Sequence, residues 1–363
     1  MALADAAGFM LDLDGTLVQR APEGVVALPG AAELIGAIRA SARPLVVFTN
    51  ASHTDPGSIA AGLREAGLEL DDQEVLTAGC SALAHLQRRY GGARVLVLGT
   101  EAARRRYGAG GVQLVEPEDA ASAEVVLTLH VDDIGLALLE AAARAVLGGA
   151  AFLTANYVRA YAGLHGPIIS RGAMAAAAIA KAAGQRPIVV GKPSRAAVRA
   201  VGERLELDPR SVAFIGDDAT MDVALGRLAG GWTVLVRSGI GARADAARLP
   251  EAHRPDLVVD GVGDLLEMLL GVLCRWVHAP TGETAHAPSP GMAHAPSRTT
   301  YRLRMSSTRR AFRRCAVSTP GITGTTRTRR ARRAKMRSST VRTRSGSVAS
   351  TSTLISSRSV ASV

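Results

Sequence analysis

The 363-residue chain contains few of the residues that define several common protein classes. Cysteine occurs three times, as Cys80, Cys274 and Cys315, so neither a disulfide framework nor a four-thiolate zinc site is expected. Aromatic residues make up 3% and hydrophobic residues 47%, so the core must consist mainly of Ala, Val, Leu and Ile. No uncharged apolar run reaches the roughly 18 residues of a membrane-spanning helix, and Asp5 and Asp12 interrupt the first apolar stretch. We therefore expect a cytoplasmic protein with no membrane partner.

Acidic residues are nearly absent from the C-terminal quarter of the chain. Residues 274–363 contain eighteen Lys and Arg but one acid, Glu283, whereas the preceding 273 residues have a formal charge of −6. After Leu273, Ser, Thr, Arg, Pro and Ala replace the periodic apolar pattern. Such a segment cannot bury enough apolar surface to offset its ordering entropy, so we expect a disordered tail. It is compatible with polyanion binding, including nucleic acid, and equally with GC-rich coding sequence translated in a shifted frame.

Short apolar segments alternate with helical patterns between residues 8 and 272. This alternation predicts parallel βαβ units and therefore an α/β fold with a doubly wound parallel sheet. The segments that we expect to be strands are residues 9–13, 44–48, 94–98, 124–129, 152–154, 188–190, 212–215, 233–236 and 257–259.

The first chemical signal is Asp12-Leu13-Asp14-Gly15-Thr16, at the end of the first expected strand. Ligands bind at the carboxyl ends of strands in open parallel sheets. One carboxylate there can attack phosphorus, and the second can exchange a proton with the leaving group. A strand followed by an Asp-Gly turn is the structural alternative, so this segment alone favours catalysis only modestly.

Two further signals follow expected strands. Thr49 and Asn50 directly follow the expected strand at residues 44–48. A hydroxyl and backbone N–H groups at this point can hold a phosphoryl oxygen. The structural alternative is that they cap a turn. Lys192 follows the strand at 188–190 and is one of three lysines in a chain in which arginine supplies nearly all the positive charges. A compact ammonium at a strand end can neutralise a carboxylate and a phosphate, although most lysines are solvated surface residues.

The fourth signal is a group of carboxylates after the strand at residues 212–215. Asp217, Asp218 and Asp222 lie within six residues and repel one another unless a cation is present. Mg²⁺ suits such a group, because it binds one or two carboxylates together with substrate oxygens and water. An acidic helix N-terminus is the alternative, and Asp218 fits that role better than the other two.

Taken together, the chain resembles the haloacid dehalogenase superfamily of phosphatases. The motifs appear in the family's order as Asp12-Leu13-Asp14-Gly15-Thr16, Thr49-Asn50, Lys192, and Gly216-Asp217 with Asp222. The long insert between Asn50 and Lys192 resembles the α/β cap of the nitrophenylphosphatase-like branch, subfamily IIA. The resemblance implies a core domain at 1–77 and 186–273, a cap at 78–185 and a tail at 274–363. It also allows an oligomer formed through the cap.

The resemblance implies a Mg²⁺-dependent, two-step hydrolysis of a small phosphorylated metabolite. Asp12 is the implied nucleophile, Asp14 the acid and base, and Thr49 a ligand of the phosphoryl group. Lys192 is implied to balance charge. Mg²⁺ is implied to be held by Asp12, the backbone carbonyl of Asp14 and Asp217, with support from Asp222.

The cap is expected to determine the substrate. At Ala155-Asn156-Tyr157-Val158 the chain departs from the branch, which usually has Thr-Asn-Pro-Asp there. Candidate substrate contacts are Asn50, Tyr157, Arg159 and His165, with Tyr161 as a further candidate. Tyr157 and Tyr161 are four residues apart, which would place them on one face of a helix, where they could simply pack.

Three functions follow from these observations. The first is hydrolysis of a phosphate monoester through an aspartyl-phosphate. The second is binding of nucleic acid or another polyanion through the Arg-rich tail. The third is a phosphotransferase on the same fold, in which an alcohol replaces water.

Overall fold

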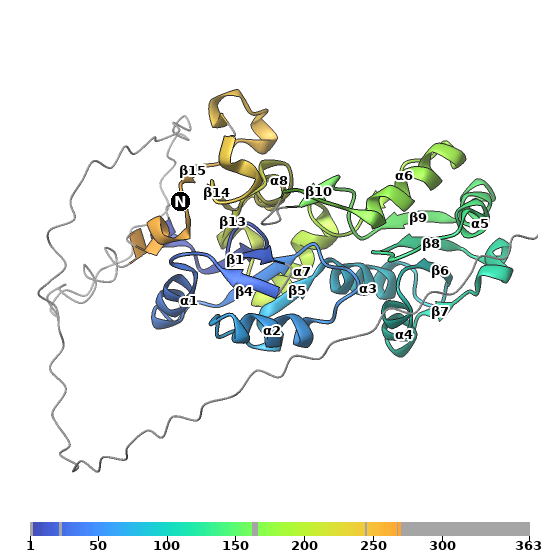
Figure 1. The fold of residues 1–363 in the computed structure, drawn as a ribbon, viewed down its shortest axis with the longest axis horizontal. Coiled ribbons are helices and arrows are strands. Elements are labelled where there is room, and N and C mark those ends of the chain that lie inside the picture. Colours follow the sequence, from blue (N-terminus) through green and yellow to red (C-terminus); the bar gives the residue numbers. More distant parts are fainter. Residues whose placement is uncertain (1–2, 22–23, 162–165, 244, 267, 270–363) are drawn as a thin grey trace, which may run out of the picture. The chain divides into compact units, whose positions relative to one another are not determined.

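Two parallel sheets organise the computed structural model, which describes residues 3–21, 24–161, 166–243, 245–266 and 268–269 (Figure 1). The six-stranded sheet has the order β15-β14-β13-β1-β4-β5, and the five-stranded sheet the order β12-β9-β8-β6-β7. All neighbouring strands within each sheet are parallel, which confirms the expected α/β class. Among these residues, no helix has the length and apolarity needed to span a bilayer.

The elements have the following bounds. The six-stranded sheet contains β1 (Gly8–Asp12), β4 (Leu45–Thr49), β5 (Val75–Thr77), β13 (Val212–Gly216), β14 (Trp232–Val236) and β15 (Leu257–Val259). The five-stranded sheet contains β6 (Arg94–Leu98), β7 (Gln113–Leu114), β8 (Val125–Thr128), β9 (Ala151–Thr154) and β12 (Ile188–Val189). Two antiparallel hairpins are β2 (Val18–Ala21) with β3 (Gly24–Ala27), and β10 (Ala160–Tyr161) with β11 (Ile168–Ile169). The helices are α1 (Ala31–Ala40), α2 (Pro56–Glu65), α3 (Ala78–Arg89), α4 (Glu101–Ala109), α5 (Leu136–Leu147), α6 (Arg171–Ala183), α7 (Arg195–Leu205) and α8 (Ala224–Ala229).

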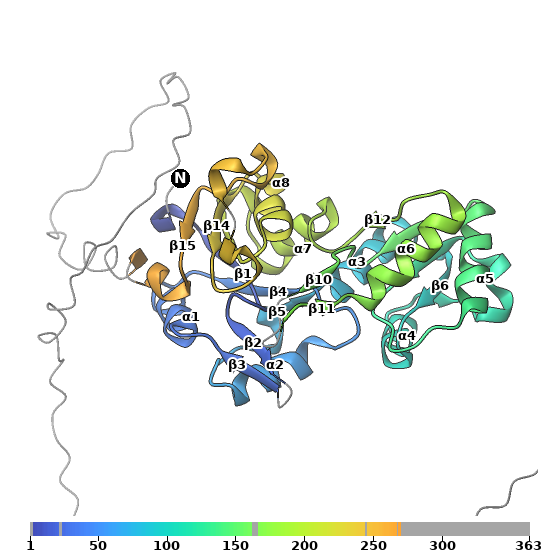
Figure 2. The same ribbon diagram turned by 45° about the horizontal axis from the view of Figure 1, so that its top comes forward.

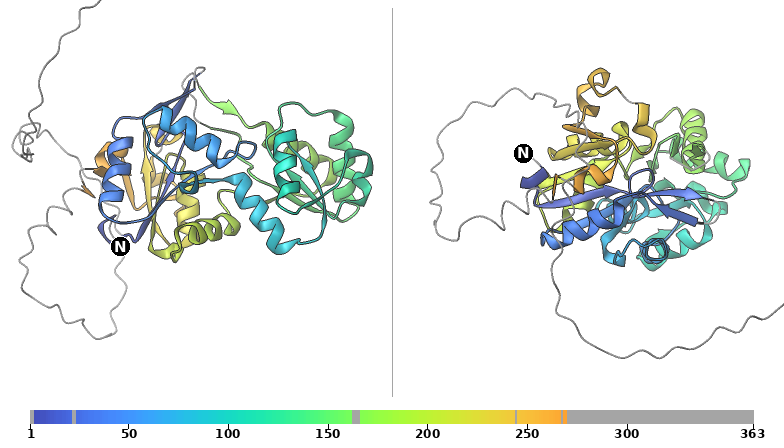
Figure 3. Two further views of the ribbon diagram at one scale, coloured as in Figure 1. Left: turned by 90° about the horizontal axis from the view of Figure 1, so that it is seen from below. Right: turned by 60° about the vertical axis from the view of Figure 1, so that its left-hand side comes forward.

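Helices cover both faces of the six-stranded sheet because successive side chains of a strand point to opposite faces. In β1, Phe9 and Leu11 pack in one cluster with Leu34 of α1, whereas Met10 packs in another with Val201 of α7. The helices α1 and α2 therefore cover one face, and α7 and α8 the other (Figures 1 and 3). This is the doubly wound arrangement that the sequence predicts.

The five-stranded sheet follows the same rule. Leu96 of β6 packs with Val146 of α5, and its neighbour Val97 packs with Leu86 of α3. The helices α5 and α6 therefore cover one face and α3 and α4 the other (Figure 2). The central strands of both sheets are buried on two faces, which explains why they are apolar runs.

One expected strand lies in a different sheet from the other strands that carry site residues. Strand β12 pairs with β9, so the segment before Lys192 belongs to the five-stranded sheet. The short strands β5 and β7 and the strands of both hairpins are not among the segments that the sequence predicts. The division into a core at 1–77 and 186–273 and a cap at 78–185 stays a proposal.

The order of the parallel strands determines where functional groups meet. Strands β13, β1 and β4 are neighbours, with Leu11 opposite Ile215 and Asp12 opposite Phe48. The carboxyl ends of all three strands therefore lie at one edge of the sheet, which is where such sheets bind ligands.

Candidate active site

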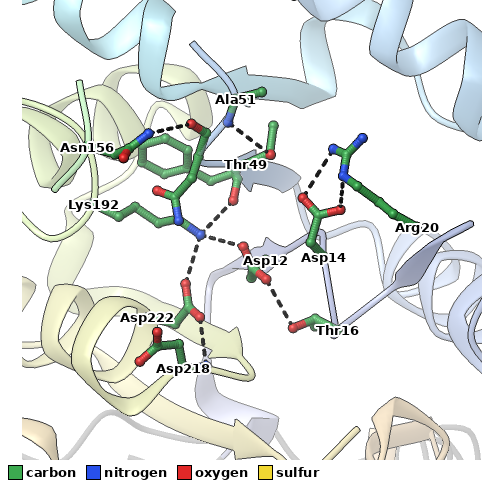
Figure 4. A network of polar contacts seen from close by, with 12 residues as sticks. Asp12, Asp14, Thr16, Arg20, Thr49, Ala51, Asn156, Lys192, Asp218 and Asp222 are labelled. Atoms are coloured by element: carbon green, nitrogen blue, oxygen red, sulfur yellow. Dashed lines mark hydrogen bonds and ion pairs between the residues drawn. The ribbon is translucent and has the colours of Figure 1, made fainter. Parts of the chain in front are cut away.

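A buried lysine connects the ends of these strands. The ammonium of Lys192 donates hydrogen bonds to Asp12 Oδ1 at 2.5 Å, to the carbonyl of Phe48 at 2.8 Å and to Asp222 Oδ1 at 2.8 Å (Figure 4). Its three donors are thus all used, and the residue is 1% exposed. Burial alone would lower the pKa of Lys192, but Asp12 and Asp222 raise it above its ordinary value. The lysine is therefore held as a cation.

The position of Lys192 depends on a close contact between backbone segments. A Cβ atom at Gly191 would lie 2.0 Å from the carbonyl oxygen of Ala155, so only glycine allows the approach. This contact lets the chain leave β12 and direct Lys192 toward β1. The lysine therefore reaches the strand ends of the six-stranded sheet from the neighbouring sheet.

Three carboxylates surround this point. Asp12, Asp217 and Asp222 are buried, and one oxygen of each lies within 4.8 Å of the others. Asp217 Oδ2 accepts a hydrogen bond from the backbone N–H of Ile240 at 2.7 Å. A Cβ atom at Gly216 would lie 2.2 Å from the carboxylate of Asp222, so the glycine makes room for it. The structure thus brings together three predicted metal ligands.

The charges of this cluster suit a divalent cation. Without one, burial and the neighbouring carboxylates raise the pKa of Asp217 to about 9. Burial likewise raises the pKa of Asp222 to about 7, although Lys192 opposes the shift. A single lysine therefore does not balance three buried carboxylates, and a hard cation with oxygen ligands would. The residues present fit Mg²⁺.

Asp14 is held apart from this cluster by an arginine. Arg20 of β2 contacts both oxygens of Asp14, with Nε 2.7 Å from Oδ1 and Nη2 3.2 Å from Oδ2 (Figure 4). Burial raises the pKa of Asp14, and the Arg20 guanidinium opposes this shift. No local pattern in the sequence predicts a role for Arg20, because its contact depends on the turn between Asp14 and the β2–β3 hairpin.

Thr49 and Asn50 lie beside Asp12, at the end of β4. The hydroxyl of Thr49 accepts a hydrogen bond from the backbone N–H of Ala51 at 3.2 Å, which is the turn-capping alternative. Asn50 lines the pocket over Asp12, and its Oδ1 is buried with no hydrogen-bond partner among the described residues. The carbonyl of Asn50 accepts a hydrogen bond from Asn156 Nδ2 at 3.3 Å. Asn156 thus joins this strand end to the segment before β10.

Strand β10 and the residues before it line one side of the pocket above Asp12. Its volume is about 20 Å³, and it is lined by Asp12, Asp14, Asn50, Val158, Ala160, Tyr161, Asp217, Asp218, Met221, Asp222 and Ile240. A cavity of this size holds about one water molecule. Val158, Ala160 and Tyr161 therefore lie next to the space over Asp12 that a phosphoryl group would occupy.

The cap candidates are not all at this pocket. Residues 155–159 form no helix and Tyr161 lies in β10, so the expected helical face shared by Tyr157 and Tyr161 is wrong. Tyr157 is 39% exposed and Arg159 is exposed, and neither lines the pocket, whereas Tyr161 does. Local spacing misled here because the chain extends toward the hairpin instead of coiling. His165 lies outside the described residues.

Asp218 has the structural role expected for it. Its Oδ1 accepts hydrogen bonds at 2.7 Å from both the backbone N–H and the hydroxyl of Thr220. These contacts cap the π-helical segment Ala219–Val223, which leads into α8. Asp218 therefore begins the helix, while Asp217 and Asp222 face the lysine and Asp12.

Comparisons with known proteins agree with this geometry. A family model described as haloacid dehalogenase-like hydrolase matches residues 9–113, and a HAD-hydrolase-like model matches residues 189–265. The D-glycerol 3-phosphate phosphatase of Mycobacterium tuberculosis is 31% identical over 69% of this chain and 68% of its own length. The sugar-phosphatase AraL of Bacillus subtilis is 29% identical over 72% of this chain and 93% of its own length.

Solved structures show the same fold. NagD from Escherichia coli has a TM-score of 0.63 and 27% identity, covering 71% of this chain and 98% of NagD. A glycerol phosphate phosphatase of Mycobacterium tuberculosis in complex with magnesium has a TM-score of 0.64 and 27% identity, covering 74% of this chain and 78% of that one.

Proposed function

Because the chain belongs to the haloacid dehalogenase-like hydrolase family, in its subfamily IIA phosphatase branch, we propose that it is a Mg²⁺-dependent phosphatase that forms an aspartyl-phosphate. The observation that carries this proposal is the buried contact between Lys192 and Asp12, beside Asp217 and Asp222. This contact and the carboxylate cluster support the proposed roles of Asp12 as nucleophile, Lys192 as a fixed cation, and Asp217 and Asp222 as groups that hold the metal.

In the first step, an oxygen of Asp12 attacks phosphorus and the bond from phosphorus to the ester oxygen breaks. The electron pair goes to the leaving oxygen, which takes a proton from Asp14. The raised pKa of Asp14, which follows from its burial, favours the protonated form that this step needs. The leaving group departs as an alcohol, and phosphorus stays bound to Asp12.

In the second step, water attacks phosphorus and gives its proton to Asp14. The bond from phosphorus to Asp12 breaks, which releases inorganic phosphate and restores both side chains. Lys192 balances the charge of Asp12 throughout, and the hydroxyl of Thr49 and the side chain of Asn50 are proposed to contact phosphoryl oxygens. The unsatisfied Oδ1 of Asn50 supports a polar occupant of the pocket.

Asp12, Asp217 and the backbone carbonyl of Asp14 are the proposed Mg²⁺ ligands, with Asp222 in support. When bound, the ion neutralises the phosphoryl group and the nearby carboxylates. The buried cluster of Asp12, Asp217 and Asp222 supports this assignment.

The substrate is proposed to be a small phosphorylated metabolite. The similar proteins include a sugar phosphatase and a D-glycerol 3-phosphate phosphatase, and the pocket above Asp12 is small, with a volume of about 20 Å³. Tyr161 is the best-placed cap contact, while Tyr157, Arg159 and His165 stay proposals.

Cytoplasmic location and polyanion binding by residues 274–363 also stay predictions, and the tail lies outside the described residues.

Metal removal provides a direct test of this function. Treatment with EDTA is expected to lower phosphate release from p-nitrophenyl phosphate by at least about a hundredfold, because a metal ion supplies several kcal/mol of charge stabilisation. Addition of excess Mg²⁺ should restore the rate. Full activity in EDTA would contradict the proposed role of the metal.

Arg20 is expected to position Asp14 for proton transfer. The substitution Arg20→Gln removes both contacts to the carboxylate. It should lower kcat for an alkyl phosphate such as glycerol phosphate by at least about tenfold, because a positioned general acid contributes roughly 10²–10⁴-fold. The loss with p-nitrophenyl phosphate should be smaller, because p-nitrophenolate leaves without a proton.

The conservative variant Arg20→Lys provides the matched control. It keeps one cation near Asp14 and should recover part of the kcat for glycerol phosphate while KM stays close to that of Arg20→Gln. Equal losses for the two substrates would show that Arg20 does not act through Asp14.

A further inference from the structure

A second groove lies between α3 and α7, away from the strand ends. It has a volume of about 120 Å³ and is lined by Ser81, Ala84, His85, Arg88, Arg89, Arg195, Ala196, Arg199, Ala200 and Glu203. Helix α3 packs on the five-stranded sheet and α7 on the six-stranded sheet, and the two helices are in contact (Figures 1 and 2). The groove thus lies where helices of the two sheets meet.

The groove carries an excess of positive charge. Four of the residues that line it are arginines, and Glu203 is the one acid among them. Glu203 pairs with Arg88 at 2.7 Å. Within the described part of the chain, Arg89, Arg195 and Arg199 make no ion pair. Three guanidinium groups are therefore available to a ligand.

Two other features add to the positive electrostatic potential in the groove. The groove includes the N-terminal turn of α7, where Arg195 is the first residue and Ser194 is the capping residue. A helix N-terminus carries a partial positive charge and attracts anions. Burial lowers the pKa of His85, and the charges of Arg89, Arg88 and Arg199 lower it further. The cations of both helices therefore act on the same space.

We propose that this groove binds a phosphate dianion, either inorganic phosphate or the phosphate group of a small metabolite. Guanidinium groups bind phosphate oxygens in pairs of parallel hydrogen bonds, which suits Arg89 on α3 and Arg199 on α7. Sites for whole drug-sized ligands have volumes of about 300–1,000 Å³. The groove is smaller, so it matches a single phosphate group better than a complete nucleotide.

The groove is structurally connected to the catalytic lysine. The hydroxyl of Ser81 on α3 donates a hydrogen bond to the carbonyl of Val190 at 2.6 Å, two residues before Lys192. Arg195 follows Lys192 by three residues. An anion held between Arg89 and Arg199 would join α3 to α7 across the segment that carries Lys192.

Calorimetric titration of the full-length, metal-free protein with inorganic phosphate tests the proposal. Without metal, the carboxylates of Asp12, Asp217 and Asp222 disfavour an anion at the strand ends. The double variant Arg89→Gln/Arg199→Gln should bind phosphate at least about tenfold more weakly than wild type, since charge-assisted hydrogen bonds are lost. Titration with phenylphosphonate, which is not hydrolysed, shows whether a phosphate group on a larger molecule also binds.

The matched control is Lys181→Gln/Arg186→Gln, which removes two exposed cations outside the groove. Both this control and Arg89→Gln/Arg199→Gln, the groove variant, keep the basic residues 274–363. Any phosphate binding by those residues is therefore the same in the two proteins. The control should bind phosphate as wild type does. Arg89→Lys/Arg199→Lys keeps both positive charges but not the paired hydrogen bonds, so it should bind more weakly than wild type and more tightly than Arg89→Gln/Arg199→Gln. Circular dichroism of each variant would show whether it is folded. Equal affinities of wild type and the groove variant, or no saturable binding by wild type, would overturn the proposal.

Discussion

The substitution Asp12→Asn is expected to lower kcat for phosphate release by at least about a thousandfold, because an amide cannot replace a carboxylate as the nucleophile. The protein should remain folded, since Lys192 keeps its contacts to Asp222 and to the carbonyl of Phe48. Loss of one charge also reduces repulsion with Asp217. Initial rates with p-nitrophenyl phosphate and circular dichroism would measure the two effects.

The matched control for this substitution is Asp208→Asn. Asp208 is an exposed carboxylate that pairs with Arg210 at 2.8 Å, so its loss should leave kcat unchanged. Beryllium fluoride should form a phosphate-like adduct with the wild-type protein and with this control, and not with Asp12→Asn. A folded Asp12→Asn protein with more than roughly a tenth of wild-type kcat would rule out the covalent route.

The substitution Lys192→Met is expected to reduce both stability and activity. It leaves Asp12 and Asp222 buried without their shared cation, and breaking a buried ion pair costs about 3–5 kcal/mol in the free energy of unfolding. Loss of this fixed charge beside the phosphoryl group should lower kcat by at least about a hundredfold. Urea unfolding and initial rates would measure these changes.

The stability loss should depend on pH in a defined direction. The pKa of Asp222 is about 7 even with Lys192 present, and removal of the lysine raises it further. A carboxyl whose pKa is raised in the folded state binds more protons there than in the unfolded chain, so stability increases as pH falls. The deficit of metal-free Lys192→Met should therefore be larger at about pH 8 than at about pH 5.

Lys181, the other lysine among the described residues, provides a control for Lys192→Met. Lys181 is exposed on α6, and Lys181→Met should change the free energy of unfolding by no more than about 0.5 kcal/mol. Similar effects of the two substitutions, or a Lys192→Met deficit that does not change with pH, would show that Lys192 does not balance buried carboxylates.

Much of the fold and the centre of the candidate site could be predicted from the sequence. The strands β1, β4 and β13 are apolar runs, and their polar residues follow at the ends, so adjacent parallel strands bring Asp12, Thr49 and Asp217 together. The helix-capping role of Asp218 was also anticipated. These features depend on local patterns and on the general rule for parallel sheets.

The pocket's surroundings could not be predicted in this way. Spacing suggested a helix that would carry both Tyr157 and Tyr161, but the segment extends into a hairpin and places only Tyr161 at the pocket. Arg20 lies close in sequence to Asp14, yet its contact needs the turn before β2. Short hairpins depend on what they pack against, so their local sequence carries little signal.

The sequence alone determined the α/β class and the order of the chemical motifs, and it provided the residues that we propose for phosphoryl transfer. The tertiary structure decided that Lys192 follows a strand of the other sheet, that β10 lies at the pocket above Asp12, and that Arg89 and Arg199 line one groove. The physical reason is the range of the interactions. Periodicity and capping act over a few residues, whereas strand order and helix packing bring together residues far apart in the chain.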